Sequence, residues 1–426
     1  MPIIDDSLPI GLIGHTLRSK NIFNIDLISN EYLQKQNKLK DNGNWNYDSA
    51  LINGSNSTCD IEVISGALLK KNVSIWSINH YLGLNRNQEV INAGIDALKK
   101  YGTGSGTSAM SGGHSDLHKK LQNKFSTIFN KQEAMLYPTG FTANLGAISG
   151  LMKGSVKENL IIIDEECHAS IIDGCKLSGV RFFRFKHNDI DDLRKKITKY
   201  KQTFTNIMVI VESIYSMSGD IAPLIEISEL KKQNNFIFYV DESHSFGFYG
   251  KNGTGLCNEL NISHNVDIIM TTLSKSCASI GGIIATSHQF CSILKWSTSY
   301  IYQAAIPPHD VAIILKSLEK IDIGDISQSL KAKTTYLRHK LKISGFDIGD
   351  NQTSIIPVYI NDHILLKKME KELINNNIYT VAIQYPIVDI SKSRFRFIVN
   401  ASHTYADLDN LVITLVRIKE NITLVV

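Results

Sequence analysis

The chain has 426 residues, which at about 150 residues per domain leaves room for one large domain with a smaller companion. The 45 Lys and Arg residues against 41 Asp and Glu give a net charge of +4, with charged residues at 20% of the chain. This balance excludes both the strongly basic proteins that bind nucleic acid and the highly charged disordered class.

The sequence shows no sign of export or membrane insertion. Its first residues, Met1 to Asp6, lack a basic segment followed by an apolar stretch, and no run approaches the ~18 apolar residues that a membrane span needs. The six cysteines include no C-x-x-C pair, so neither a zinc site nor a redox motif is indicated. We therefore expect a cytoplasmic protein without a metal ion.

Residues 1–75 show little sustained periodicity and are predicted to form an N-terminal arm. Residues 76–308 differ, because short apolar runs alternate there with helical patterns, which is typical of βαβ units in a parallel sheet. Helices are expected near residues 117–128 and 190–197. The apolar runs predicted as strands are Leu160–Ile163, Ile207–Val211, Phe236–Val240 and Val266–Met270.

The pattern is interrupted at Pro307 and Pro308, which predicts a domain boundary. A smaller unit over residues 309–426 is expected beyond it. Its strands are predicted near residues 355–360 and 395–399.

Polar residues follow three of the predicted strands. They are Asp164 to Glu166, Glu212 with Ser213, and Asp241 to His244. In open α/β sheets, ligands bind at the carboxyl ends of the strands. These strand ends therefore mark a candidate site.

Lys275 stands in a polar turn, Thr271 to Ser276, directly after a predicted strand. On its own, such a lysine is usually a solvated surface charge. However, Asp241 ends the preceding predicted strand, and a carboxylate fixed at a sheet edge is what a protonated pyridine nitrogen requires. A Schiff-base lysine with a pyridinium-pairing aspartate is the minimal equipment for pyridoxal phosphate chemistry, so the pair indicates this cofactor.

Three nearby segments add weaker signals. The turn from Tyr137 to Asn144 enters an apolar helix, whose free backbone N–H groups and positive end suit a phosphate. His168 follows another strand and is placed to stack on a flat ring, although a lone histidine is more often structural. His244 lies three residues after Asp241, near the same edge.

Seven motifs in register give the chain a resemblance to the α-oxoamine synthases, in the fold-type I superfamily of pyridoxal phosphate enzymes. The resemblance runs from about Asn79 to about Ala406. It implies an α/β transferase with an N-terminal arm, a large, mostly parallel-sheet cofactor domain and a smaller α+β C-terminal domain. The motifs are Asn79-His80-Tyr81-Leu82-Gly83-Leu84, Gly140-Phe141-x-Ala143-Asn144, His168-Ala169-Ser170, Tyr215-Ser216-Met217-x-Gly219-Asp220, Asp241-Glu242-Ser243-His244, Thr272-Leu273-Ser274-Lys275 and Arg394-Phe395-Arg396.

The resemblance implies roles for the residues around the cofactor ring. Lys275 would form the Schiff base, Asp241 would pair with the pyridine nitrogen, and His168 would stack on the ring. Ser216 and His244 would contact the phenolic oxygen.

The same resemblance assigns the phosphate and the substrate. Gly140 and Phe141 would supply phosphate-facing amides, with Thr272 as a hydroxyl ligand. Arg396 matches the residue that holds the amino-acid carboxylate, a pairing that is often bidentate. Asn79 matches a residue that contacts substrate.

The implied reaction is a decarboxylating condensation. Lys275 would remove the Cα proton of a bound amino acid, the carbanion would attack an acyl thioester, and loss of CO2 would leave an α-aminoketone and a free thiol. Acyl-coenzyme A or an acyl-carrier protein would be the donor. Sites in this family are built between subunits, so a homodimer is implied.

Two positions depart from the family pattern. Ser108 stands in a glycine-rich segment where many relatives carry arginine. Ala304 stands before the double proline, where relatives often place hydroxyl residues that reach the neighbouring subunit's phosphate. These departures bear on thioester handling and on the cross-subunit contact, while the catalytic residues are all present.

The motifs disagree about the branch of the family. Ser213 to Ser216, Asp241 to Ser245 and Gly250 to Leu256 resemble quorum-sensing autoinducer synthases, which we favour, whereas His168 to Cys175 and Ser274 to Gly282 resemble serine palmitoyltransferases. Synthases acting on alanine or glycine are further alternatives. A plain aminotransferase, which needs no thioester, and a non-catalytic partner subunit, which lacks the lysine, are more remote.

Overall fold

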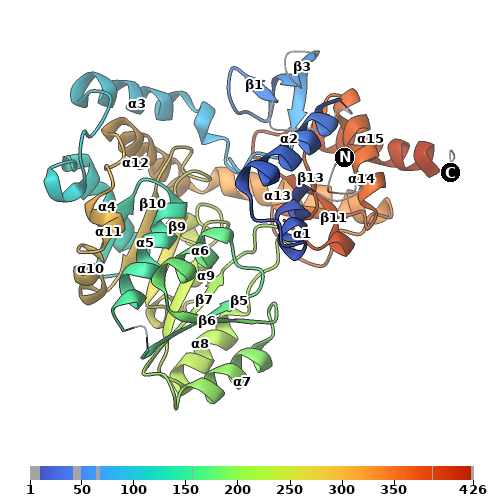
Figure 1. Cartoon of the computed structure of the whole chain (residues 1–426). Helices are drawn as coiled ribbons and strands as arrows, with labels where there is room; N and C mark the ends of the chain where they lie inside the picture. The colour runs from blue at the N-terminus through green and yellow to red at the C-terminus, as the bar shows by residue number, and fades with distance from the viewer. Residues whose placement is uncertain (1–9, 42–48, 64–67, 156, 386, 424–426) are drawn as a thin grey trace. The chain divides into compact units, whose positions relative to one another are not determined.

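The computed structural model describes residues 10–41, 49–63, 68–155, 157–385 and 387–423, so part of the predicted arm lies outside the described residues. The chain forms two compact units (Figure 1). The larger unit comprises Asn79–Ala332 and Asn351–Ser354. The smaller unit joins the chain up to Ile78 with Lys333–Asp350 and the residues from Ile355 onward.

The larger unit is built on a seven-stranded sheet. Its strands are β4 Glu133–Tyr137, β5 Asn159–Asp164, β6 Arg181–Phe185, β7 Asn206–Glu212, β8 Ile237–Asp241, β9 Ile268–Thr272 and β10 Gly282–Thr286. They lie in the order β4-β10-β9-β8-β7-β5-β6. β10 pairs antiparallel with both neighbours, and the other neighbouring strands pair in parallel. This arrangement confirms the predicted mostly parallel sheet.

The central strands are continuous apolar runs apart from polar residues at their ends, as expected of strands that helices cover on both faces of a sheet. β5 reads Asn-Leu-Ile-Ile-Ile-Asp, and all of its residues are buried. α5 packs on β4, β9 and β10. The helices of this unit are α3 Gln88–Tyr101, α4 Asp116–Ile128, α5 Gly140–Met152, α6 Ala169–Ser178, α7 Ile190–Tyr200, α8 Leu224–Gln233, α9 Leu256–Glu259, α10 His288–Leu294, α11 Thr298–Ile301 and α12 Pro308–Ile323.

The double proline begins α12, which is part of the larger unit. α12 packs on α3 and α4. The contact with α3 is close, because a Cβ placed on Gly94 would lie 2.9 Å from the Ile313 side chain. The next helix, α13 Asp325–Ile343, runs from the larger unit into the smaller one. The division into residues 1–75, 76–308 and 309–426 stays a prediction.

The smaller unit contains N-terminal and C-terminal residues of the chain and is built around two small sheets. One sheet has the order β1-β2-β3-β12, and its core is Ile61, Val73 and Ile75; the other has the order β11-β14-β13. The strands are β1 Ala50–Ile52, β2 Thr58–Val63, β3 Leu68–Ile75, β11 Ile355–Tyr359, β12 Ile378–Tyr379, β13 Ala382–Ile383 and β14 Arg394–Ile398. The helices are α1 Ile13–Ser19, α2 Ile25–Asp41, α14 His363–Asn375 and α15 Tyr405–Thr423. The pairing of β3 with β12 explains why the N-terminal segment shares a unit with the C-terminal residues.

Within the described ranges, none of the helices combines the length and the apolar character needed to cross a membrane.

Candidate active site

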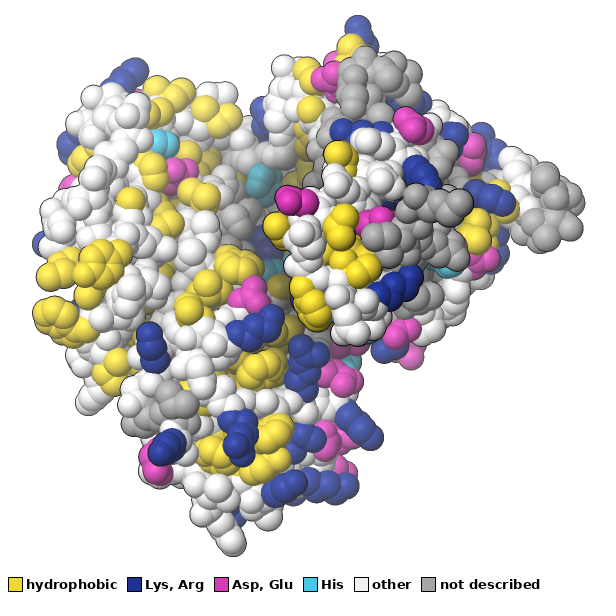
Figure 2. Space-filling model, in the orientation of Figure 1, with side chains coloured by type: hydrophobic (Ala, Val, Ile, Leu, Met, Phe, Trp, Pro, Cys, Tyr) yellow, Lys and Arg dark blue, Asp and Glu magenta, His cyan; other side chains and the backbone are white. Residues whose placement is uncertain are grey.

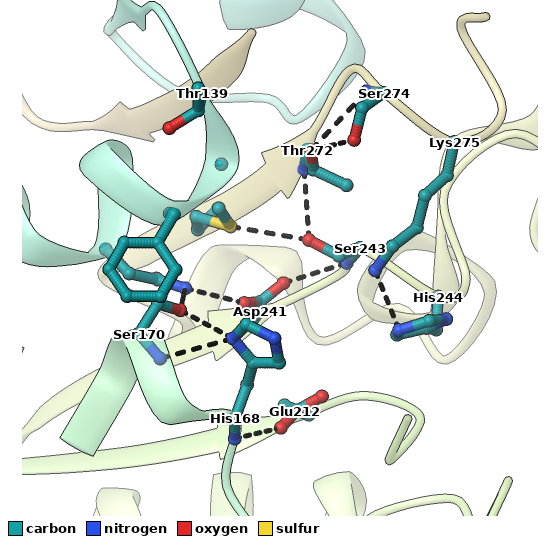
Figure 3. Close-up of a pocket in the computed structure, with 14 residues that line it drawn as sticks. Thr139, His168, Ser170, Glu212, Asp241, Ser243, His244, Thr272, Ser274 and Lys275 are labelled. Atoms are coloured by element: carbon teal, nitrogen blue, oxygen red, sulfur yellow. Dashed lines mark hydrogen bonds between the residues drawn. The ribbon is translucent and has the colours of Figure 1, made fainter. Parts of the chain in front are cut away.

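A cavity of about 250 Å³ lies at the carboxyl edge of the large sheet (Figure 3). Its walls come from the ends of β7, β8 and β9 and from the first turns of α5 and α6. Its volume is near the lower end of the ~300–1,000 Å³ range of small-molecule sites. The lining residues are Thr139, Gly140, Phe141, Asn144, His168, Ser170, Glu212, Asp241, Ser243, His244, Met270, Thr272, Ser274 and Lys275.

Lys275 reaches into this cavity from the turn after β9, and its amine meets His244 (Figure 3). The Lys275 Nζ lies 2.7 Å from His244 Nε2, and His244 Nδ1 lies 2.7 Å from the Tyr81 hydroxyl oxygen. When Nε2 accepts from the amine, the imidazole proton sits on Nδ1 and points to Tyr81. The three side chains therefore form one hydrogen-bonded chain that ends at the lysine.

Asp241 ends β8, and both of its carboxylate oxygens are held. Oδ1 accepts from the Ser243 amide at 2.9 Å, and Oδ2 accepts from Asn144 Nδ2 at 3.0 Å. The side chain is buried, so these donors compensate for the loss of water. A buried carboxylate fixed in this way is suited to pair with a cationic ring nitrogen.

Glu212 ends β7 and lies in register with Asp241 on the neighbouring strand. Burial raises the pKa of Glu212 to about 8, and the charge of Asp241 adds to the rise. At pH 7 Glu212 is therefore mostly a neutral acid.

His168 caps the first turn of α6. Its Nδ1 lies 2.8 Å from Ser170 Oγ and accepts from the Ser170 amide at 3.2 Å, while its own amide donates to Glu212 Oε1 at 2.5 Å. The imidazole meets the Phe141 ring edge to face, with centroids 6.3 Å apart. The ring is thus fixed at its Nδ1 side and lines the cavity.

The N-terminus of α5 supplies an anion-binding end to the cavity. Thr139 and Thr142 satisfy each other's amides in a capping box. The amides of Gly140 and Phe141 make no hydrogen bond with any of the described residues, and they carry the positive end of the helix dipole. A Cβ on residue 140 would lie 2.6 Å from the Thr272 Cβ, so glycine is required there.

Two hydroxyl groups complete this end. Thr272 Oγ1 lies 2.9 Å from Ser274 Oγ. Both residues line the cavity from the end of β9. Free amides at a helix N-terminus beside hydroxyl groups form a site for a phosphate group.

The chain matches the family model for aminotransferase class I and II over residues 71–415. A serine palmitoyltransferase from Sphingobacterium spiritivorum is 35% identical over 82% of this chain and 87% of its own length. An 8-amino-7-oxononanoate synthase from Thermoanaerobacter pseudethanolicus is 34% identical over 80% of this chain and 86% of its own. The chain belongs to the α-oxoamine synthases. This membership confirms the predicted family, the fold class and the enzyme class.

A high-resolution structure of a serine palmitoyltransferase that contains pyridoxal phosphate has the same fold as this α-oxoamine synthase. The TM-score is 0.87 at 27% identity, covering 94% of this chain and 100% of the other. Pyridoxal phosphate is therefore the cofactor, as predicted. The cavity fits it, because one cavity offers a lysine amine, a fixed carboxylate and a helix end suited to a phosphate.

Seven of the predicted cofactor residues of this α-oxoamine synthase line the cavity: Lys275, Asp241, His168, His244, Gly140, Phe141 and Thr272. Asn79 and Ser216, which are described and belong to the same unit, do not line it. Ser216 is buried in the turn after β7. Arg396 is buried on β14 in the smaller unit. The roles of all ten residues, including the seven that line the cavity, stay predictions.

The sequence assigned no role to the other seven lining residues, which are Thr139, Asn144, Ser170, Glu212, Ser243, Met270 and Ser274. Signals existed for two of them. Glu212 is the polar end of a predicted strand, and Asn144 lies one helical turn after Gly140. No group of three or more His, Cys, Asp or Glu side chains in the described ranges is arranged to hold a metal ion.

Proposed function

We propose that the enzyme condenses an amino acid with an acyl thioester to give an α-aminoketone, CO2 and a free thiol. In the net reaction, the amino-acid Cα loses a proton and its carboxyl group and bonds to the acyl carbon. The C–S bond breaks, and the thiolate and Cα each take up a proton, one of them the proton released from Cα and the other from solvent. The observation that carries the proposal is the Lys275 amine inside the cavity, in a chain whose relatives are α-oxoamine synthases.

Lys275 and His244 are suited to moving the Cα proton. The amine points into the cavity and is hydrogen bonded to His244 Nε2, so a proton that arrives on Nζ has an acceptor at 2.7 Å. Tyr81 fixes the other side of the imidazole. When bound, pyridoxal phosphate supplies the electron sink that stabilises the negative charge left at Cα.

Asp241 and the N-terminus of α5 would hold the ring nitrogen and the phosphate of the cofactor. The negative charge of Asp241, held by the Ser243 amide and by Asn144, would keep a ring nitrogen protonated. The Gly140 and Phe141 amides would hold the phosphate. Arg396 is assigned to the amino-acid carboxylate by resemblance alone.

The identity of the amino acid separates two candidates. The motifs at Ser213 to Ser216 and Gly250 to Leu256 support an autoinducer-type synthase. Several curated relatives and solved structures are serine palmitoyltransferases, which supports serine with a long-chain acyl thioester. Both candidates share the same bond changes, and either acyl-coenzyme A or an acyl-carrier protein fits the donor role.

The two remote alternatives make different demands. An aminotransferase would convert an amino acid to a keto acid without any thioester. A non-catalytic partner subunit would lack the Schiff-base lysine, whereas Lys275 is present and lines the cavity.

The deciding experiment incubates the holoenzyme with serine, alanine, glycine or 2-aminobutyrate, with and without palmitoyl-coenzyme A or a shorter acyl thioester, and measures thiol release. We expect thiol release that depends on both substrates, and the amino acid that supports it selects the branch. Lys275→Ala is the matched control without activity. Keto acid formation from an amino acid alone, with no thiol released, would overturn the proposal in favour of an aminotransferase.

We also propose that the enzyme works as a homodimer in the cytoplasm. Large apolar side chains are exposed on the edge of the larger unit that carries α10 and α11 (Figure 2). They include Trp296 at 74% exposure and Tyr302 at 83%. Such a patch is typical of an interface. Size-exclusion chromatography with light scattering should give twice the mass of one chain. The mass of a monomer would contradict the proposal.

The cysteines support the cytoplasmic assignment. None of the six, all of them within the described ranges, forms a disulfide bond, and all but Cys59 are buried. Cysteines without disulfide bonds are expected where glutathione and thioredoxin keep thiols reduced.

A further inference from the structure

Asn144 is a buried amide in the apolar helix α5, one turn after Gly140, and is 1% exposed. An unpaired amide in such a place would cost stability. Its Nδ2 donates to Asp241 Oδ2 at 3.0 Å and to Ser170 Oγ at 2.9 Å, and its Oδ1 accepts from the Tyr239 hydroxyl at 2.6 Å. The amide therefore makes three hydrogen bonds, to an aspartate, a serine and a tyrosine.

The direction of these hydrogen bonds is fixed by Asp241, because a carboxylate oxygen accepts and must therefore face the NH2 group of Asn144. The opposite orientation would set the amide oxygen against a carboxylate. The amide oxygen then faces Tyr239. Burial raises the pKa of this tyrosine well above its usual value, so its hydroxyl keeps its proton and can donate to Asn144 Oδ1.

The first consequence concerns Asp241. The donor to Oδ2, together with the Ser243 amide on Oδ1, fixes the orientation of the carboxylate. Glu212, the neighbouring carboxyl group on β7, takes the His168 amide instead. Among the described residues, Asn144 is therefore the side chain that donates to Asp241.

The second consequence concerns His168. Because Ser170 Oγ accepts from Asn144, its own proton is available to His168 Nδ1 at 2.8 Å. The Ser170 amide also donates to Nδ1, so this nitrogen is an acceptor and a neutral ring carries its proton on Nε2. The donor series runs from Tyr239 through Asn144 and Ser170 to His168.

We propose that Asn144 is a positioning residue that fixes the carboxylate of Asp241 and the imidazole of His168 together, as one unit with the phosphate-binding end of α5. The geometry joins the start of α5, the start of α6 and the end of β8 through one side chain. The inference deepens the proposed function. It rests on that function only where the test below measures kcat/KM, and not where it measures cofactor binding.

The test compares Asn144→Ala and Asn144→Asp with the control Asn159→Ala. Asn159 is also a buried asparagine of the larger unit, 4% exposed. It donates to the Met152 carbonyl at 2.8 Å and accepts from Asn206 at 2.8 Å, but it does not line the cavity. The control therefore measures the cost of losing a buried asparagine without touching the site.

The first readout is the dissociation constant of pyridoxal phosphate, measured by titrating the apoenzyme and following the visible absorbance. Asn144→Ala should weaken binding between about 10-fold and 100-fold, because a hydrogen bond to a charged group is lost. Asn159→Ala should leave the constant within about threefold at a similar loss of melting temperature. Because no thioester is needed, this readout stands even when the condensation reaction fails.

The second readout is the pH dependence of kcat/KM for whichever reaction the holoenzyme catalyses. In Asn144→Asp, two carboxyl groups would lie where Asn144 and Asp241 now meet, and they would share one proton at low pH. The shared proton replaces the lost donor, so the ratio of variant to wild-type kcat/KM should fall as pH rises. In Asn144→Ala the ratio should stay flat. A flat ratio in Asn144→Asp, or cofactor binding by Asn144→Ala within threefold of wild type, would overturn the proposal.

Discussion

Two histidines at the carboxyl edge of the large sheet, His168 and His187, have opposite surroundings. His187 follows β6, and its Nδ1 lies 2.9 Å from Asp164 Oδ1 while its Nε2 lies 3.3 Å from Asp220 Oδ2. His168 contacts a serine through one nitrogen, and its ring lines the cavity. His187 is enclosed by acidic partners, whereas His168 is held by a serine and lines the cavity.

The difference appears in the charge of His187. Burial acts to lower its pKa, but the hydrogen bonds to Asp164 and Asp220 outweigh burial and raise the pKa to about 10. His187 is therefore a cation whose charge is neutralised within its own cluster. The comparison teaches that polar residues at strand ends form two kinds of group. In the group around His187 the side chains hydrogen bond to one another, whereas the group around His168 and Lys275 lines a cavity that can take a ligand.

The largest effect is expected for a substitution of Lys275 in the group that lines the cavity. Lys275→Ala removes the amine that reaches into the cavity, so we expect no turnover above the background rate. Steady-state product formation by the variant measures this directly. Product formed at the wild-type rate would show that the base is another residue.

Asp241→Asn should have the next largest effect. The variant keeps the shape of the side chain but loses its negative charge, so we expect kcat to fall at least ~1,000-fold, or about 4 kcal/mol in the barrier. Cofactor binding, followed by visible absorbance, serves as the control for folding. A rate within about tenfold of wild type would contradict the pairing of Asp241 with the ring nitrogen.

His187→Gln tests the cluster of His187 with Asp164 and Asp220, where we expect an effect on stability. The cluster is only partly buried, so loss of one partner should lower the free energy of unfolding by about 2 kcal/mol at neutral pH, between the values for exposed and buried ion pairs. The folded pKa is raised above the unfolded value of 6.5, so the contribution is fully present below pH 6.5 and is lost as pH rises toward 10.

Urea unfolding from pH 6 to pH 10 measures this contribution. The difference between wild type and His187→Gln should shrink with rising pH. Lys176→Ala, which breaks an exposed pair with Asp173, is the control and should cost less than about 1 kcal/mol. A difference that does not change with pH would show that His187 is not charged.

The smallest effect is expected for Glu212→Gln. Since burial and the charge of Asp241 raise the pKa of Glu212 to about 8, this residue is neutral at pH 7, and glutamine reproduces its acceptor for the His168 amide. We expect kcat/KM within about threefold of wild type at pH 7, with a difference that appears only above pH 8. A loss of more than 100-fold at pH 7 would show that the ionised form is required.

Most of the large sheet could be predicted from the sequence, because strands covered on both faces are continuous apolar runs. The predicted runs became β5, β7, β8 and β9. The antiparallel strand β10 was not predicted. Only Leu273–Gly281 separates it from β9, which is too short for the crossover that a parallel pair needs, so its direction follows once the strand is recognised.

The site could be predicted only as far as residue types and strand ends allow. Lys275 and Asp241 are found that way, because their chemistry is specific and each stands at a strand end. Sequence position did not show that Glu212 faces the cavity while Asp164 faces His187, since both end apolar strands. That distinction depends on where the residues after β5 and β6 place His168 and His187.

The two positions that depart from the family pattern are neighbours in space. Ser108 and Ala304 form a backbone bridge, and the Ala305 amide donates to the Thr107 carbonyl at 3.0 Å. Residues that share a backbone pairing are seldom independent when substituted. The two departures are thus expected to be epistatic, so arginine at 108 and a hydroxyl residue at 304 would have to be introduced together to recover the arrangement of the relatives.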